Sequence, residues 1–104
     1  MTIDWNGAVL NYCQKAYGKR RGKIIKEKLQ YIDNRVFFAM RGFTLLGWFK
    51  DSYPKEKIMD DMFKVSIIND ILVGEDALDE IITTAEYLKK ELRMEINTLQ
   101  REET

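Results

Sequence analysis

The sequence contains no histidine, a single cysteine and a single proline, and its net charge is zero. Without histidine the chain lacks the commonest general base, the Ser–His and Cys–His nucleophilic pairs and the commonest metal ligand. One cysteine, Cys13, can form neither a thiolate zinc site nor an internal disulfide. The sequence also has no glycine loop of the phosphate-binding or dinucleotide-binding type. We therefore expect a protein that is not an enzyme, with no catalytic residue, no metal site and no cofactor.

Long apolar segments are also missing from this chain. Its most apolar run, Val36–Phe49, covers 14 residues and includes Arg41, whereas a helix that spans a bilayer needs about 20 apolar residues. The N-terminus shows no basic segment followed by an apolar one, as a secretory signal would. A single cysteine is typical of a reducing compartment. We expect a cytoplasmic protein without a membrane span.

The composition is that of a folded protein, with 45% hydrophobic and 33% charged residues in a chain of 104. This length predicts one domain, residues 1–104. The charges are unevenly distributed along it. Residues 15–28 hold seven cations and one carboxylate, a net charge of +6, whereas residues 74–104 hold nine carboxylates and four cations, a net charge of −5.

Apolar residues at spacings of three and four predict helices along most of the chain. Asp4 is a candidate N-cap, Gly18 and Gly74 are candidate helix ends, and Pro54 suits the first turn of a helix. We expect an all-α fold, a four-helix bundle-like single domain with a long C-terminal helix. The predicted helices cover residues 4–17, 23–49 (with a possible break at Asp33-Asn34), 54–73 and 75–101.

The stretch 28–49 also allows an α+β alternative, in which it forms a small β-meander. Asp33-Asn34 and Arg41-Gly42 would then be the turns, and the aromatic and β-branched residues would suit strands. The continuous apolar run at Val36–Met40 argues against this, because half-exposed strands alternate polar and apolar residues.

The apolar run Val36–Phe49 has two interpretations. In the first it is a buried helix at the centre of the fold. In the second it is partly exposed and forms a protein interface, with Trp48 and Phe49 as anchors, since aromatic residues are favoured at interface hot spots. Residues 54–73 carry apolar residues on more than one face, so we expect that helix to be buried on two sides.

The C-terminal helix carries a narrow apolar stripe flanked by alternating acidic and basic residues, which resembles a coiled-coil surface. The stripe covers about 22 residues, and a helix of that length is about 33 Å long at 1.5 Å per residue, which exceeds the width of a compact body of this size. We therefore expect its tail, from about Glu91, to extend beyond the body and to pair with a second copy. The predicted interface residues on this helix are Leu88, Leu92, Ile96 and Leu99.

The basic segment 15–28 supports an alternative function, because clustered cations can follow a phosphate backbone. No helix-turn-helix pattern accompanies it. The candidate nucleic-acid-binding residues are Lys15, Lys19, Arg20, Arg21, Lys23 and Lys26.

The sequence as a whole favours a non-catalytic regulatory, adaptor or inhibitor protein that acts through protein–protein contacts and forms a homo-oligomer. Its protein partner is not identified by any motif. Nucleic-acid binding through residues 15–28 is the alternative, and a ligand-binding oligomer with a pocket between subunits is a third class.

Overall fold

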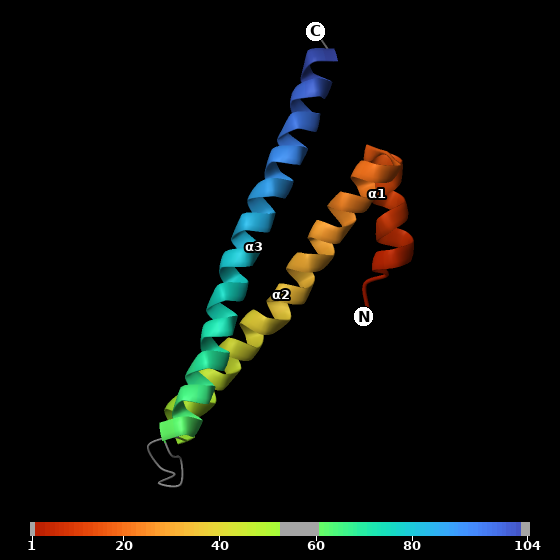
Figure 1. Ribbon diagram of the computed structural model, residues 1–104. Helices are drawn as coiled ribbons and strands as arrows, with labels where there is room; N and C mark the ends of the chain where they lie inside the picture. The colour runs from red at the N-terminus through yellow and green to blue at the C-terminus, as the bar shows by residue number, and fades with distance from the viewer. Residues whose placement is uncertain (1, 53–60, 103–104) are drawn as a thin grey trace. The chain divides into compact units, whose positions relative to one another are not determined.

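The computed structural model describes residues 2–52 and 61–102. In chain order these residues form a short π-helix, η1 (Trp5–Val9), and the α-helices α1 (Leu10–Tyr17), α2 (Lys19–Ser52) and α3 (Asp61–Glu102) (Figure 1). The described residues contain no strand, which confirms the all-α fold class. The β-meander at 28–49 is wrong, because α2 continues through both of its proposed turns.

The first helical segment has the boundaries that the sequence predicted. The carboxylate of Asp4 accepts hydrogen bonds from the backbone N–H groups of Gly7 and Ala8, each at 3.1 Å, and so acts as the N-cap of η1. At the other end, α1 stops at Tyr17 because Gly18 adopts φ 93° and ψ 166°, a backbone conformation that is almost restricted to glycine.

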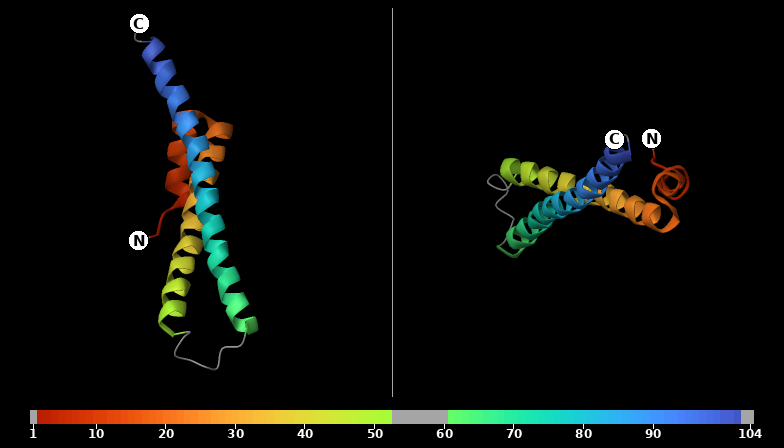
Figure 2. Two further views of the ribbon diagram at one scale, coloured as in Figure 1. Left: turned by 90° about the vertical axis from the view of Figure 1, so that its left-hand side faces the viewer. Right: turned by 90° about the horizontal axis from the view of Figure 1, so that it is seen from above.

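The start of α2 corrects the predicted boundary at residue 23. Residues 19–22, which lie between two of the predicted helices, are helical from Lys19, and the N–H of Gly22 donates to the carbonyl oxygen of Gly18 at 2.8 Å. Gly22 serves close packing rather than a turn, since a Cβ at this position would lie 2.4 Å from the Cα of Gln14. The missing side chain lets α1 lie directly against the first turns of α2, as Figure 2 shows.

The helix end predicted at Gly74 is wrong, because α3 is one helix from Asp61 to Glu102. Gly74 is buried within this helix, and a Cβ there would lie 2.9 Å from the Cα of Gly42. Its role is therefore the close approach of two helices, which offsets the cost of a glycine in a helix interior. The predicted helix start at Pro54 lies outside the described residues.

The chain divides into two compact units. Unit 1 comprises Met1–Asp33 and Ile82–Thr104, and unit 2 comprises Asn34–Ile81. Both α2 and α3 contribute a segment to each unit. Unit 1 therefore contains η1, α1, the first part of α2 and the last part of α3, whereas unit 2 contains the remainder of α2 and α3.

Small residues form the centre of unit 2. Ala39 and Ala77 are buried, as are Gly42 and Gly74, and the two glycines bring the α2 and α3 segments into backbone contact. Toward the ends of these segments the ring of Trp48 meets that of Phe63 edge-to-face, with centroids 6.3 Å apart. These contacts show that the two segments run antiparallel within unit 2.

The apolar run Val36–Phe49 does not form the buried centre that its composition suggested. Within it the small residues Ala39 and Gly42 are buried, whereas Phe37, Met40 and Phe43 are 63–66% exposed. The first interpretation, a buried core helix, is therefore wrong for Phe37, Met40 and Phe43, whereas other large side chains of the run are half-buried. The reason is that only one side of the α2 segment is covered by α3 within unit 2.

Candidate functional site

The four interface residues predicted on the C-terminal helix lie in the part of α3 that belongs to unit 1. Leu92 and Leu99 are 53% and 59% exposed, and Leu88 and Ile96 are half-buried. The tail of α3 does not become free at Glu91, as predicted, because Glu91 and Glu95 both form ion pairs with Arg21 of α2. The exposed leucines therefore lie beside a packed face of the helix and not on a free end that begins at Glu91.

These leucines belong to a longer apolar stripe along α3. Its members follow one another at alternating intervals of three and four residues, the repeat of a coiled-coil seam. Most are exposed and the rest are half-buried. The α3 stripe consists of Ile68, Ile71, Glu75 and Leu78 in unit 2, and Ile82, Ala85, Lys89, Leu92, Ile96 and Leu99 in unit 1.

The stripe is separate from the face of α3 that packs within each unit. In unit 2 that packed face contains Gly74 and Ala77, and in unit 1 it contains Thr84, Glu91 and Glu95. The helix α3 therefore has one face that packs within each unit and a second, mostly exposed face that carries the stripe. The expectation that residues 54–73 are buried on two sides is therefore wrong where the structure describes them, since Ile68 and Leu72 are exposed.

Unit 2 contains an apolar groove beside the stripe. Gly42 and Gly74 lie where the two helices touch, and larger side chains of both helices line the groove above them. Its volume is about 200 Å³. The remaining lining residues are Phe43, Leu46, Ile71, Glu75 and Leu78. The two glycines let the helices touch, and the larger side chains around that contact enclose space for an apolar group.

Sequence reasoning missed this groove. If residues 28–49 are helical, Gly42 and Gly47 are expected to let a neighbouring helix come close. This is confirmed at Gly42, which contacts Gly74, and not at Gly47, which has nothing within 4 Å of a Cβ. The helix end predicted at Gly74 left the other half of that contact unidentified. The signal that would have found it is the second three-and-four repeat on α3, because a second apolar repeat on one helix marks a surface beyond the first packed face.

Trp48 and Phe49, the predicted aromatic anchors, lie near the end of α2 in unit 2. Trp48 remains 40% exposed although its ring contacts Phe63. Phe49 is half-buried. Both therefore contribute to packing within unit 2, and Trp48 keeps an exposed surface as well.

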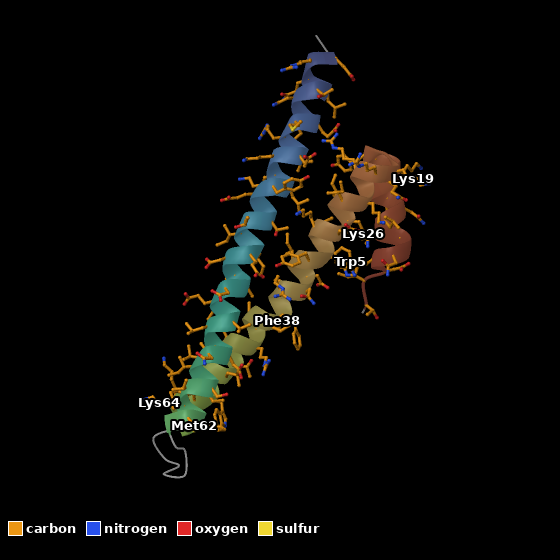
Figure 3. All side chains as sticks on the ribbon, viewed as in Figure 1. Trp5, Lys19, Lys26, Phe38, Met62 and Lys64 are labelled. Carbon is orange, nitrogen blue, oxygen red and sulfur yellow. The ribbon has the colours of Figure 1, made fainter. Side chains whose placement is uncertain are left out.

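The six candidate nucleic-acid-binding residues do not form one exposed set. Lys15, Lys19, Arg20 and Lys23 are exposed, whereas Arg21 and Lys26 make contacts inside unit 1. Figure 3 labels Lys19 at the start of α2 and Lys26 two turns further along. Only four of the six cations are thus free to face a phosphate backbone.

Arg21 links the start of α2 to the C-terminal part of α3. Its guanidinium donates to Glu91 through Nε at 2.9 Å and through Nη2 at 2.5 Å, and to Glu95 through Nη1 at 2.6 Å. The hydrogen bond with Glu91 is the main cause that raises the pKa of Arg21 above its ordinary value. The raised pKa means that the folded protein favours the protonated guanidinium of Arg21 more than the unfolded chain does.

Lys26 is the most deeply buried cation among the described residues, at 6% exposure. Its ammonium donates to Oδ1 of Asn6 and to Oε1 of Gln30, both at 3.1 Å. Both acceptors are neutral amide oxygens, and Asn6 precedes α1 in the chain. Lys26 therefore joins the N-terminal helical segment to α2, a role in packing that removes it from the exposed basic surface.

Among residues 2–52 and 61–102, no three or more Cys, Asp and Glu side chains are grouped so that they would hold a metal ion. Within the same residues, no helix is both long enough and apolar enough to cross a membrane. The candidate functional surfaces of this chain are the groove of unit 2 with the adjoining part of the α3 stripe, and the part of the α3 stripe in unit 1. No protein family, no curated protein and no solved structure matches the chain.

Proposed function

We propose that this chain is a non-catalytic regulatory, adaptor or inhibitor protein that acts through protein–protein contacts and self-association. The observation that carries this proposal is the distribution of its apolar side chains. Among the described residues, 22 large hydrophobic side chains are exposed, whereas the buried apolar residues are Ile25, Ala39 and Ala77.

Exposed hydrophobic residues are ordinary when they are scattered singly over a surface. Here part of the exposed set is ordered: Phe43 and Leu78 border the groove of unit 2. Five of the exposed residues follow one helical repeat along α3, namely Ile68, Leu78, Ile82, Leu92 and Leu99. A large contiguous apolar surface is typical of a protein interface. Burial of one leucine or isoleucine side chain contributes about 1.5–3 kcal/mol, so a stripe of this length supplies a substantial drive for association.

The test is the mass of the protein in solution, measured by size-exclusion chromatography with light scattering. We expect a mass above the 12.3 kDa of one chain. The double variant Leu92→Glu/Ile96→Glu should reduce the mass to that of a monomer, because it places two carboxylates in the apolar stripe. A wild-type monomer at high micromolar concentration would contradict the self-association.

The matched control is Met94→Glu/Asn97→Glu, which likewise replaces two neutral residues of the same helix by carboxylates, at exposed positions away from the stripe. Helical geometry turns these positions by more than 100° from the stripe. The control should keep the wild-type mass, and circular dichroism should show the same helicity in all three proteins.

A second candidate function is nucleic-acid binding. It is supported by the exposed cations Lys15, Lys19, Arg20 and Lys23, which lie at adjoining ends of α1 and α2 in unit 1. The compartment that we propose for either function is the cytoplasm, in keeping with a single cysteine and no intrachain disulfide.

A further inference from the structure

We propose that the groove of unit 2 binds the C-terminal half of α3 from a second copy of this chain, with the two α3 helices antiparallel. The occupant is the unit 1 part of the α3 stripe, residues 82–99. This inference rests on the proposed self-association and adds to it the binding site, the occupant and the direction of pairing.

The shape of the groove fits a helix that presents apolar side chains. Its floor is the contact of Gly42 with Gly74, and its volume of about 200 Å³ is lined mainly by apolar residues. The unit 1 part of the stripe offers Leu92 at 53% exposure and Leu99 at 59%. Because the stripe has the same three-and-four repeat in both units, the two surfaces match in spacing along the helix.

Two charged residues in the stripe decide the direction of pairing. Glu75 lies seven residues before Ile82 and Lys89 lies seven residues after it, and both are exposed. In a parallel pair in register, Glu75 would face Glu75 of the other copy, and Lys89 would face Lys89. An antiparallel pair centred near Ile82 instead brings each Glu75 opposite a Lys89, so that like charges are avoided and opposite charges meet.

The same alignment places apolar groups at the groove. Leu92 follows Lys89 by three residues, and Ile71, which lines the groove, precedes Glu75 by four residues. When Glu75 lies opposite Lys89 of a second copy, Leu92 of that copy reaches the wall formed by Ile71. We assign Leu92 as the side chain that enters the groove.

The net charges of the two units favour the same occupant. Unit 1 contains eleven cations and eight carboxylates, a net charge of +3, and unit 2 contains six cations and nine carboxylates, a net charge of −3. Antiparallel α3 helices place unit 2 of one copy beside unit 1 of the other. On either side of the Ile82 centre the contact then joins regions of opposite net charge, and a second copy of this chain supplies both of them.

The first test reverses the charges in the stripe. We expect Glu75→Lys and Lys89→Glu to raise the dissociation constant of the dimer at least tenfold each, measured by analytical ultracentrifugation at low salt. The double variant E75K/K89E should restore it to within about threefold of wild type. A parallel dimer would respond to none of these changes, since each one replaces one like-charged pair by another, and that result would overturn the antiparallel pairing.

The matched controls are Asp76→Lys and Lys90→Glu. Each makes the same change of charge one residue away, at an exposed position turned by about 100° around the helix. Both controls should leave the dissociation constant within about twofold of wild type. If a control variant weakened the dimer as much as the corresponding stripe variant, the effect would come from net charge alone. That result would contradict the proposed pairing of the stripes.

The second test measures a distance between copies. A spin label at Asn97→Cys, in a Cys13→Ser background, lies on an exposed position fifteen residues from Ile82. The antiparallel pair predicts a label separation of about 45 Å at 1.5 Å per residue, whereas a parallel pair predicts roughly 20 Å, the width of two helices. A distribution centred at the shorter distance would overturn the antiparallel pairing while leaving the self-association intact.

The two proposals fail in different ways. A dimer with the shorter label distance, or one insensitive to E75K and K89E, removes this inference and keeps the proposed function. A wild-type monomer removes this inference and the self-association on which it rests.

Discussion

At the scale of single residues, the glycines are the most informative positions, because the same residue type has a different structural role at each of them. Gly18 supplies a backbone conformation with positive φ, Gly22 admits α1 against α2, and Gly42 and Gly74 bring two helices into contact. Gly47, by contrast, has nothing within 4 Å of where a Cβ would lie. These differences predict opposite effects of the same substitution to alanine.

We expect Gly74→Ala to destabilise the protein. The added Cβ would lie 2.9 Å from the Cα of Gly42 and 3.1 Å from the carbonyl oxygen of Phe38, and neither backbone atom can move aside without separating the helices. The overpacking outweighs the better helix preference of alanine, so the expected net loss is about 1–2 kcal/mol. Urea denaturation at a fixed protein concentration measures it.

Gly47→Ala is the matched control for that prediction, since it makes the same change in α2 of unit 2 where space is open. It should stabilise the protein by about 0.5–1 kcal/mol through helix propensity alone. Equal effects of the two substitutions would contradict the close contact of Gly42 with Gly74.

At the scale of elements, the corner between α1 and α2 depends on one backbone conformation. Gly18 has φ 93° and ψ 166°, and nothing within 4 Å would obstruct a side chain there. We therefore expect Gly18→Ala to cost about 1–3 kcal/mol through backbone strain and not through a clash. Thermal unfolding followed by circular dichroism measures the loss.

The control for this corner is Lys19→Ala, at the next residue, which is exposed and helical. It should leave the stability within about 0.5 kcal/mol of wild type. A Gly18→Ala protein that is as stable as this control would show that the corner adopts another conformation.

At the scale of the whole molecule, the distribution of charge determines how strongly nucleic acid can bind. Lys15, Lys19, Arg20 and Lys23 are exposed, whereas Arg21 and Lys26 are engaged within unit 1. Four phosphate contacts predict a slope of about −3.6 in a plot of log affinity against log salt for duplex DNA, compared with about −5.4 for all six cations. Fluorescence anisotropy with a labelled duplex measures this slope.

Arg20→Glu/Lys23→Glu should abolish that binding, and Lys50→Glu, an exposed reversal in unit 2, should preserve it. No binding at low salt would rule out the nucleic-acid alternative. Binding that survives R20E/K23E would place the nucleic-acid site elsewhere on the chain.

The sequence by itself determined the helical nature of this protein and the ends of its first helix. Periodicity of apolar residues predicts helix because it follows from local geometry, and Asp4 and Gly18 act on the backbone next to them. The sequence also predicts the heptad-like repeat near the C-terminus, because that repeat follows from the spacing of Leu92, Ile96 and Leu99 alone.

Only the tertiary structure decided how the glycines and the apolar residues are used. A glycine that ends a helix and a glycine that lets a second helix approach look alike in sequence, and the difference at Gly74 depends on Gly42, 32 residues earlier. Likewise, the composition of Val36–Phe49 predicts burial, but burial requires a covering element. Within unit 2 the small residues Ala39 and Gly42 face that element, and Met40 and Phe43 remain exposed.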